Sequence, residues 1–285
     1  MKDPEPLPGP PAPEEPPKLP PFPPPSETFL VLLASIVAFM LAGVLLVQLG
    51  RAALFITEMF FLVPAVLYLR TRGYGIRRCF RWNSVSPALV LTSLAVGLAV
   101  IVLLDEVDRL VNLIYPMPEE YREAIMGFME LNSWQDWLLV GSGVILAAAV
   151  FEESLFRGFV QLSFEAHGSV NRAVLISALL FALAHFNPWW TVQILLLGVF
   201  LGFLSWRSDS TLPGMFIHGL NNGLALAAGG AAVGQEWAWY TLGPHVHPAI
   251  LIGAVALLFA GMKLFLRQTE NTFTETLNPD ESPAT

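Results

Sequence analysis

The stretch VFEESLFR, residues 150–157, decides the fold because it places three full charges inside a segment that otherwise predicts a membrane-spanning helix. Residues 137–151, which lead into it, carry no charge, and ions within a bilayer are costly and rare. Glu153 and Arg157 are four residues apart and share a helical face, which predicts an ion pair between them. Glu152 is rotated by about 100° from Glu153. It is left without a cation and is therefore a candidate functional residue.

The composition indicates a polytopic membrane protein. The chain has 285 residues, of which 54% are hydrophobic and 13% charged, whereas about 25% are charged in an ordinary soluble domain. Its mean hydropathy is +0.58. The net charge of −8 offers no basic face, so no nucleic-acid partner is expected and the lipid bilayer is the main surrounding. The single cysteine, Cys79, excludes an internal disulfide and any Cys-X-X-Cys motif.

Apolar runs predict an all-α membrane helix bundle of about eight transmembrane helices, since a helix needs roughly 20 apolar residues to cross. Residues 173–206 carry no aspartate, glutamate, lysine or arginine and are too long for one crossing, so the sequence Asn187-Pro188 is expected to divide them into two helices. The other spans are predicted at residues 29–48, 52–69, within 82–104, 137–164, 213–231 and 248–265.

Five regions follow from these runs. Residues 1–27 are predicted as a disordered, proline-rich arm, and residues 28–136 as the first three transmembrane helices with an extracytoplasmic loop from 105 to 136. A short amphipathic helix is expected in that loop near 121–131. Residues 137–231 form the predicted catalytic core, residues 232–269 the last loop and final transmembrane helix, and residues 270–285 a polar tail.

Lysine and arginine predict the orientation, because cytoplasmic loops are enriched in both. Five arginines lie between residues 70 and 81, and a cytoplasmic N-terminus keeps them inside together with most other basic residues. We therefore predict a multi-pass protein of the cell (inner) membrane with both termini in the cytoplasm.

Two further polar pairs have helical spacing. His185 follows Phe181 by four residues, and His218 precedes Asn222 by four, so each pair shares a face. Gly198/Gly202 and Gly219/Gly223 have the small-xxx-small spacing that lets helices approach closely. We expect Glu152, His185 and His218 to be able to converge in the cytoplasmic half of the membrane. A structural interpretation competes with this one, because histidine and asparagine in membrane helices often only bridge neighbouring helices.

Four other polar residues are predicted to lie outside the site. Glu58 is expected to be structural or interfacial, His167 to lie in a loop, and His245 and His247 to face the membrane interface.

In these three motifs the sequence resembles the CPBP intramembrane proteases, a family that includes the CAAX prenyl endopeptidases and bacterial bacteriocin-processing or abortive-infection relatives. The motifs read EESLFR at 152–157, FALAH at 181–185 and HGLNN at 218–222. The resemblance covers about residues 137–230 and rests on the ordered triple, since each motif alone is weak. It implies an intramembrane endopeptidase in which His218 and Asn222 hold the oxyanion.

The residue types suit peptide hydrolysis, which needs a base to activate water and donors for the developing oxyanion. Glu152 is the natural base, His185 would orient the water or share its proton, and His218 and Asn222 would donate hydrogen bonds to the oxyanion. Glu153 and Arg157 would hold the fourth transmembrane helix in place, and Phe181 would buttress His185.

Zinc is the alternative cofactor, held by Glu152, His185 and His218. His-Glu-x-x-His, which sets two zinc ligands on one helix, is absent, and Asn222 would be a poor zinc ligand. We favour a mechanism without metal or cofactor.

Two other classes of function remain open at this stage. Buried Glu, His and Arg also build proton relays, so a proton-coupled transporter is one alternative, and a non-catalytic membrane scaffold or immunity protein is the other. For a protease, the expected substrate is a membrane-associated peptide or protein. A site open to the cytoplasm would suit a C-terminal or juxtamembrane peptide, and the resemblance includes cleavage after a prenylated cysteine.

Overall fold

Helices make up almost all of the described chain. The computed structural model describes residues 22–231 and 239–270, with the side chains of 128, 129 and 229–231 left aside. Most of the predicted arm, 1–21, and most of the predicted tail, 271–285, therefore lie outside the described residues. The helices along the bundle are α1 (Pro25–Leu45), α2 (Ala53–Arg72), α4 (Pro87–Ile114), α6 (Trp134–Gly141), α7 (Ala148–Glu153), α8 (Gln161–Ala166), α9 (Val170–Ala184), α10 (Thr191–Ser208), α11 (Leu212–Ala231) and α12 (Pro248–Gln268).

Shorter elements connect these helices. A 3-10 turn, η1 (Val47–Ala52), joins α1 to α2, and α3 (Ile76–Cys79) follows α2. The helix α5 (Glu119–Met129) confirms the expected helix after the third span. The two-stranded ribbon of β1 (Thr241–Leu242) and β2 (His245–Val246) precedes α12 and was not predicted.

The predicted membrane bundle is confirmed. Six helical stretches are long and apolar enough to cross a membrane, at 25–45, 47–72, 87–114, 134–166, 191–208 and 248–268. The helix α9 is apolar but has only 15 residues, and α11 has 20. Asn187 and Pro188 separate α9 from α10, as the sequence predicted.

One boundary was wrong. The sequence placed an extramembrane loop from residue 105 onward, but α4 continues to Ile114. Asp105 and Arg109 lie one turn apart and pair at 3.0 Å between Oδ2 and Nε. Opposite charges at this spacing support a helix, so the charged residues extend α4 instead of ending it.

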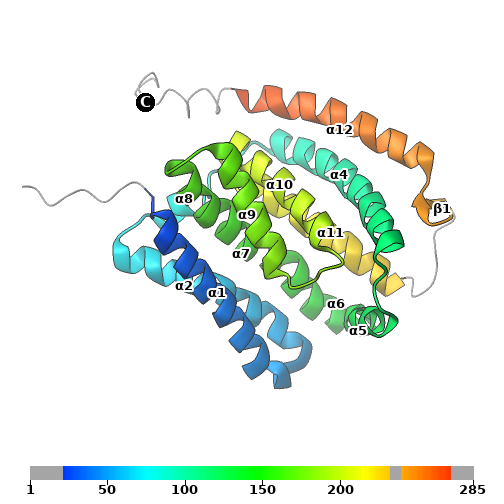
Figure 1. Cartoon of the computed structure of the whole chain (residues 1–285), viewed down its shortest axis with the longest axis horizontal. Coiled ribbons are helices and arrows are strands. Elements are labelled where there is room, and N and C mark those ends of the chain that lie inside the picture. Colours follow the sequence, from blue (N-terminus) through cyan, green and yellow to red (C-terminus); the bar gives the residue numbers. More distant parts are fainter. Residues whose placement is uncertain (1–21, 232–238, 271–285) are drawn as a thin grey trace, which may run out of the picture.

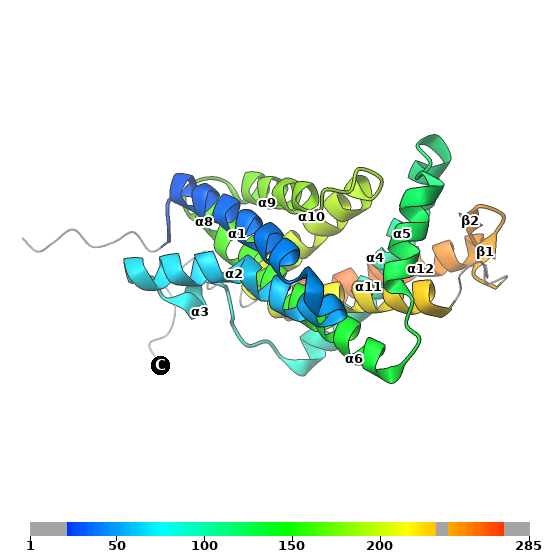
Figure 2. The same cartoon turned by 90° about the horizontal axis from the view of Figure 1, so that it is seen from below.

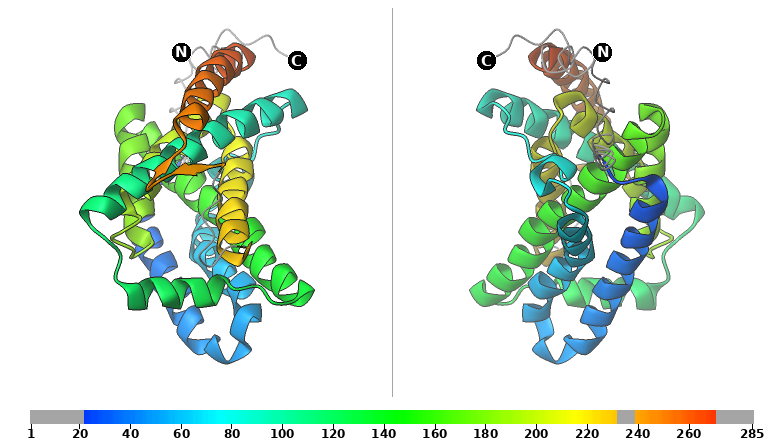
Figure 3. Two further views of the ribbon diagram at one scale, coloured as in Figure 1. Left: turned by 90° about the vertical axis from the view of Figure 1, so that its right-hand side faces the viewer. Right: turned by 90° about the vertical axis from the view of Figure 1, so that its left-hand side faces the viewer.

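The bundle has two distinct ends. The terminal end is where α1 begins and α12 finishes (Figure 1), and α3 lies there too (Figure 2). The α5 end is opposite, and α5, α6 and the β1–β2 ribbon lie there (Figure 2). The α1–α2 hairpin forms one edge of the bundle and α12, packed on α4, forms the other (Figure 3).

Small residues let the central helices approach closely, as the sequence predicted. A Cβ on Gly198 would lie 3.1 Å from the Cβ of Ala178 on α9, and a Cβ on Gly219 would lie 3.2 Å from the carbonyl oxygen of Ile145. The core beside them contains Phe156, Phe159 and Phe181, each about 1% exposed. The motif-bearing helices therefore occupy the middle of the bundle.

Candidate active site

The two adjacent carboxylates lie on a short helix between two π-helical segments. The helix α7 ends at Glu153, and η2 (Ser142–Ala147) and η3 (Ser154–Val160) flank it. All of these segments belong to one continuous apolar stretch, 134–166. π-helical turns are rare and occur frequently at functional sites.

Glu153 and Arg157 form the ion pair that their spacing predicts. Oε1 of Glu153 lies 2.9 Å from Nη1 of Arg157, and both side chains are 0% exposed. The guanidinium also lies over the ring of Phe181, with Cζ 4.0 Å from the ring centroid. A buried charge needs such partners because its desolvation is costly.

Glu153 has a second partner that the sequence did not predict. The Nδ1 atom of His218, on α11, donates to Oε1 of Glu153 at 3.1 Å. Phe181 makes edge contacts with both imidazoles, at centroid distances of 4.7 Å from His185 and 5.8 Å from His218. The interpretation of Glu153 as only a helix-positioning residue was therefore incomplete, because this carboxylate connects Arg157 to a candidate site residue.

Glu152 lies between the two histidines. Its Oε2 is 3.9 Å from Nε2 of His185 and 3.8 Å from Nε2 of His218. The side chains are 13% exposed for Glu152, 31% for His185 and 4% for His218. The helices α7 and α11, together with the residue directly after α9, thus bring together the residues that the sequence expected to converge.

In each imidazole, the group that is hydrogen-bonded to Nδ1 on the side away from Glu152 (its outer partner) determines which ring nitrogen carries the hydrogen. Nδ1 of His185 lies 2.8 Å from the carbonyl oxygen of Phe181, and a carbonyl oxygen only accepts, so Nδ1 carries the hydrogen. In His218 the carboxylate of Glu153 holds the hydrogen on Nδ1 in the same way. When either ring is neutral, the lone pair of its Nε2 therefore faces the carboxylate of Glu152.

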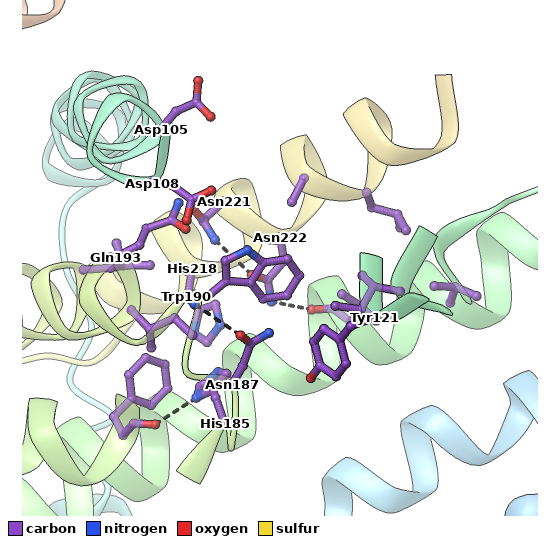
Figure 4. A pocket seen from close by; sticks show the side chains of 18 of the residues that line it. Asp105, Asp108, Tyr121, His185, Asn187, Trp190, Gln193, His218, Asn221 and Asn222 are labelled. Atoms are coloured by element: carbon purple, nitrogen blue, oxygen red, sulfur yellow. Dashed lines mark hydrogen bonds between the residues drawn. The ribbon is translucent and has the colours of Figure 1, made fainter. Parts of the chain in front are cut away.

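A cavity of about 690 Å³ lies beside this group and is lined by both histidines. Glu152 is not among the lining residues, and its Oε2 is buried without a hydrogen-bond partner. Figure 4 shows side chains around this space from α4, α5, α10, α11 and the segment between α9 and α10. Its labelled polar and aromatic residues are Asp105, Asp108, Tyr121, His185, Asn187, Trp190, Gln193, His218, Asn221 and Asn222.

Asn222 lines the cavity, but its amide already has partners. Nδ2 of Asn222 donates to the carbonyl oxygen of Val144 in η2 at 2.9 Å, and Oδ1 accepts from Asn221 at 3.2 Å. This fixes the plane of the amide, so that the second hydrogen of Nδ2 is held in a set direction.

Sequence reasoning missed several lining residues. Asn187 was interpreted only as part of a helix break, yet it lines the cavity, and its Oδ1 accepts from the backbone N–H groups of Trp189 and Trp190 at 3.1 and 3.2 Å. The turn itself could have been predicted, because asparagine before proline commonly accepts hydrogen bonds from the backbone two or three residues on, but its place in the cavity could not. Asp108 and Gln193 carried no motif and could not have been found.

Glu58 on α2 lies nearer the site than its structural interpretation implied. It interacts electrostatically with Glu152, and its Oε2 is buried without a hydrogen-bond partner. The remaining histidines are elsewhere, with His167 bonded to the carbonyl oxygen of Ser163 and His245 to Glu106.

The arrangement can be tested for zinc. Zinc with bonds of about 2.1 Å in tetrahedral geometry separates its ligand atoms by about 3.4 Å. The separations of 3.8 and 3.9 Å around Glu152 are longer, and among the described residues no three His, Cys, Asp or Glu side chains are placed to hold a metal ion. The outer partners of the histidines do resemble those of metal-bound histidines.

Comparison with known proteins gives one family. Residues 132–224 match the family model described as type II CAAX prenyl endopeptidase Rce1-like. That segment contains all three motifs and α6 to α10 completely. Neither the curated proteins nor the solved structures contain a significant match.

Proposed function

We propose that the chain is an intramembrane endopeptidase that uses Glu152 to activate water, because residues 132–224 match the Rce1-like CAAX prenyl endopeptidase family model. The observation that carries the proposal is the convergence of Oε2 of Glu152 with the Nε2 atoms of both histidines, at 3.8 and 3.9 Å. One water molecule can donate its two hydrogens to Oε2 of Glu152 and to Nε2 of His185 through ordinary hydrogen bonds of about 2.8 Å. The substrate is a peptide bond in a membrane-associated protein or peptide.

In this mechanism Glu152 takes a proton from the bridging water, and the water oxygen forms a bond to the carbonyl carbon of the peptide. His185 orients the water through Nε2. When the C–N bond breaks, the proton held by Glu152 passes to the leaving amine. The products are a carboxylic acid and an amine, so the atoms and protons balance without a further reactant.

The oxyanion would be held by His218 and Asn222. His218 donates from Nε2 as an imidazolium that already carries its second proton before the water attacks and keeps it throughout, and the carboxylate of Glu153 at its Nδ1 stabilises that imidazolium as a carboxylate does in a catalytic triad. The free hydrogen of the Asn222 amide is the second donor. Donors fixed in advance are effective because they need no reorganisation during the reaction.

Zinc held by Glu152, His185 and His218 is the second candidate, favoured by the outer partners of the two imidazoles. Bound zinc would supply a water of lowered pKa. We prefer the metal-free site because the Glu152 to histidine separations exceed the tetrahedral value. Metal analysis of the purified protein, with hydrolysis measured before and after chelation, distinguishes the two sites. Loss of hydrolysis on chelation and its return with zinc would overturn our preference.

The central prediction concerns Glu152→Gln, which keeps the shape of the side chain and removes its basicity. We expect hydrolysis of a membrane-presented peptide to fall by about 10²–10⁴-fold, the usual contribution of a positioned acid–base group. The measurement is peptide turnover in proteoliposomes. Wild-type turnover would refute the assignment.

Glu120→Gln on α5 is the control, since it makes the same change at an exposed carboxylate. Glu120 does not line the cavity, so we expect hydrolysis to persist. A proton-coupled carrier would instead lose flux in Glu152→Gln without ever cleaving a peptide, and a scaffold would lose neither.

A further inference from the structure

The cavity beside Glu152 extends toward the α5 end of the bundle. Its lining includes Asp105 and Asp108 near the end of α4, Tyr121 on α5 and Asn187 in the turn between α9 and α10. All of these elements lie at the end opposite to the first residue of α1 and the last of α12 (Figure 2). A second, smaller cavity of about 200 Å³ shares Asp108 and Trp190 with it and lies at the same end.

Basic residues of the described chain gather at the other end. Around the terminal end lie Arg70, Arg72, Arg77, Arg78, Arg81, Arg172, Arg207, Lys263 and Arg267. Three lie toward the α5 end: Arg51, Arg109 and Arg122. Enrichment of lysine and arginine near the ends of the spans marks the cytoplasmic side. The terminal end is therefore expected to face the cytoplasm.

From these two observations we propose that the cavity opens to the extracytoplasmic face and takes its substrate from that side. The proposal rests on the proposed endopeptidase function. The substrate class is then an extracytoplasmic segment of a membrane-anchored protein or peptide. A prenylated C-terminus exposed to the cytoplasm would meet the closed end of the bundle.

The walls of the two cavity ends support this direction. Toward the terminal end the bundle is closed by tightly packed side chains, because Phe156, Phe159 and Arg157 are at most about 1% exposed. At the α5 end Asp105 is paired with Arg109, whereas Asp108 forms no ion pair within the described residues, so the unpaired carboxylate of Asp108 gives this end of the cavity a negative charge. Substrate segments with basic residues near the scissile bond would be attracted to such an opening.

Access from the extracytoplasmic face differs from the sequence-based prediction of a site open to the cytoplasm. That prediction rested on the expected convergence of Glu152, His185 and His218 in the cytoplasmic half of the membrane, which carries no information on where the bundle is open. The opening is created by the α4 extension and by α5, which contribute residues outside all three motifs.

The experiment uses single added cysteines in the full chain. Ala225 on α11 lines the cavity and is exposed, and Ser169 is exposed at the terminal end before α9, where its side chain makes no capping hydrogen bond. Neither residue belongs to the catalytic group. Cys79, the native cysteine, is 1% exposed, and burial raises the pKa of its thiol to about 11, so the unmodified protein gives the background.

Ala225→Cys and Ser169→Cys are each treated with a membrane-impermeant sulfonate-bearing methanethiosulfonate, in right-side-out and in inside-out vesicles. We expect Ala225→Cys to react in right-side-out vesicles and Ser169→Cys in inside-out vesicles only. The reverse pattern, or reaction of Ala225→Cys from both faces, would overturn the proposal. So would an Ala225→Cys thiol that stays unreactive in detergent as well, because the cavity would then be closed.

This readout does not need enzyme activity, so its failure can be distinguished from failure of the proposed function. Labelling is repeated in the Glu152→Gln background, where the same pattern is expected. Normal hydrolysis by Glu152→Gln together with the expected labelling would refute the proposed function but not the access proposal. Loss of hydrolysis together with reversed labelling would refute the access proposal but not the proposed function.

Discussion

Glu153 is the residue through which structural support and chemistry are joined. Its Oε1 contacts both Nη1 of Arg157 and Nδ1 of His218, at 2.9 and 3.1 Å. The ion pair with Arg157 could be predicted because spacing of four residues fixes a shared helical face. The contact with His218 could not, because these residues are 65 positions apart and no local rule relates them. No local rule relates Glu152 to His185 and His218 either, and their approach was predicted only from the three motifs.

At this scale we predict that Glu153→Gln destabilises the protein by about 3–5 kcal/mol, because it leaves the buried Arg157 guanidinium without a counter-charge. The double variant Glu153→Gln with Arg157→Met should recover most of that loss, since replacing both ions removes the unpaired charge. Thermal unfolding in detergent measures both. The prediction would be contradicted if the single variant were as stable as the wild type, or if the double variant were no more stable than the single variant.

At the scale of elements, the helices followed from apolar runs, while their interruptions and extensions did not. The predicted division at Asn187-Pro188 and the helix in the loop after α4 are both present. The π-helical segments η2 and η3 were not foreseen, because apolar periodicity does not distinguish them from ordinary helix. The extension of α4 past Asp105 was missed because charge was taken as the end of a span.

The segment η3 predicts a glycine requirement. A Cβ on Gly158 would lie 2.6 Å from Cα of Phe80 and 2.7 Å from its carbonyl oxygen, and backbone cannot give way as a side chain does. We expect Gly158→Ala to lower the unfolding free energy by about 1–3 kcal/mol through overpacking. Gly253→Ala on α12 is the control, because a Cβ there meets nothing within 4 Å and alanine favours helix. Equal unfolding temperatures for the two variants would contradict this close contact.

For the whole molecule, the segment that matches the family is built into a larger bundle. The helices before residue 132 contribute Asp105, Asp108 and Tyr121 to the cavity, and Trp82 donates from Nε1 to Oγ of Ser154 at 2.9 Å. The sequence analysis treated the predicted catalytic core and the first three spans as separate regions, because only the core contains recognisable motifs. In the structure these contacts connect the two regions, and residues of both line the cavity.

Arg81 provides the tightest of these connections. Its guanidinium binds both carboxylate oxygens of Glu165, at 3.1 and 2.8 Å, and donates from Nε to Asp209 at 2.9 Å. Arg81 is 2% exposed. The cluster of Arg81, Glu165 and Asp209 connects three parts of the chain, which are the segment after α3, the helix α8 and the turn before α11. A planar guanidinium can hold two carboxylates at once, whereas an ammonium is a single point charge.

We therefore expect Arg81→Lys to lower the unfolding free energy by about 2–3 kcal/mol, the value of the charged hydrogen bonds that lysine cannot make. Arg70→Lys is the matched control, since Arg70 is exposed at the same end of the bundle and the same substitution there should leave stability unchanged. Unfolding temperature in detergent is the measurement, with turnover of a membrane-presented peptide as the second readout. If Arg81→Lys matched Arg70→Lys in both, the first spans would not depend on this cluster for their attachment to residues 132–224. A fall in Arg81→Lys alone would mean that the arrangement of the cavity depends on a residue that no motif contains.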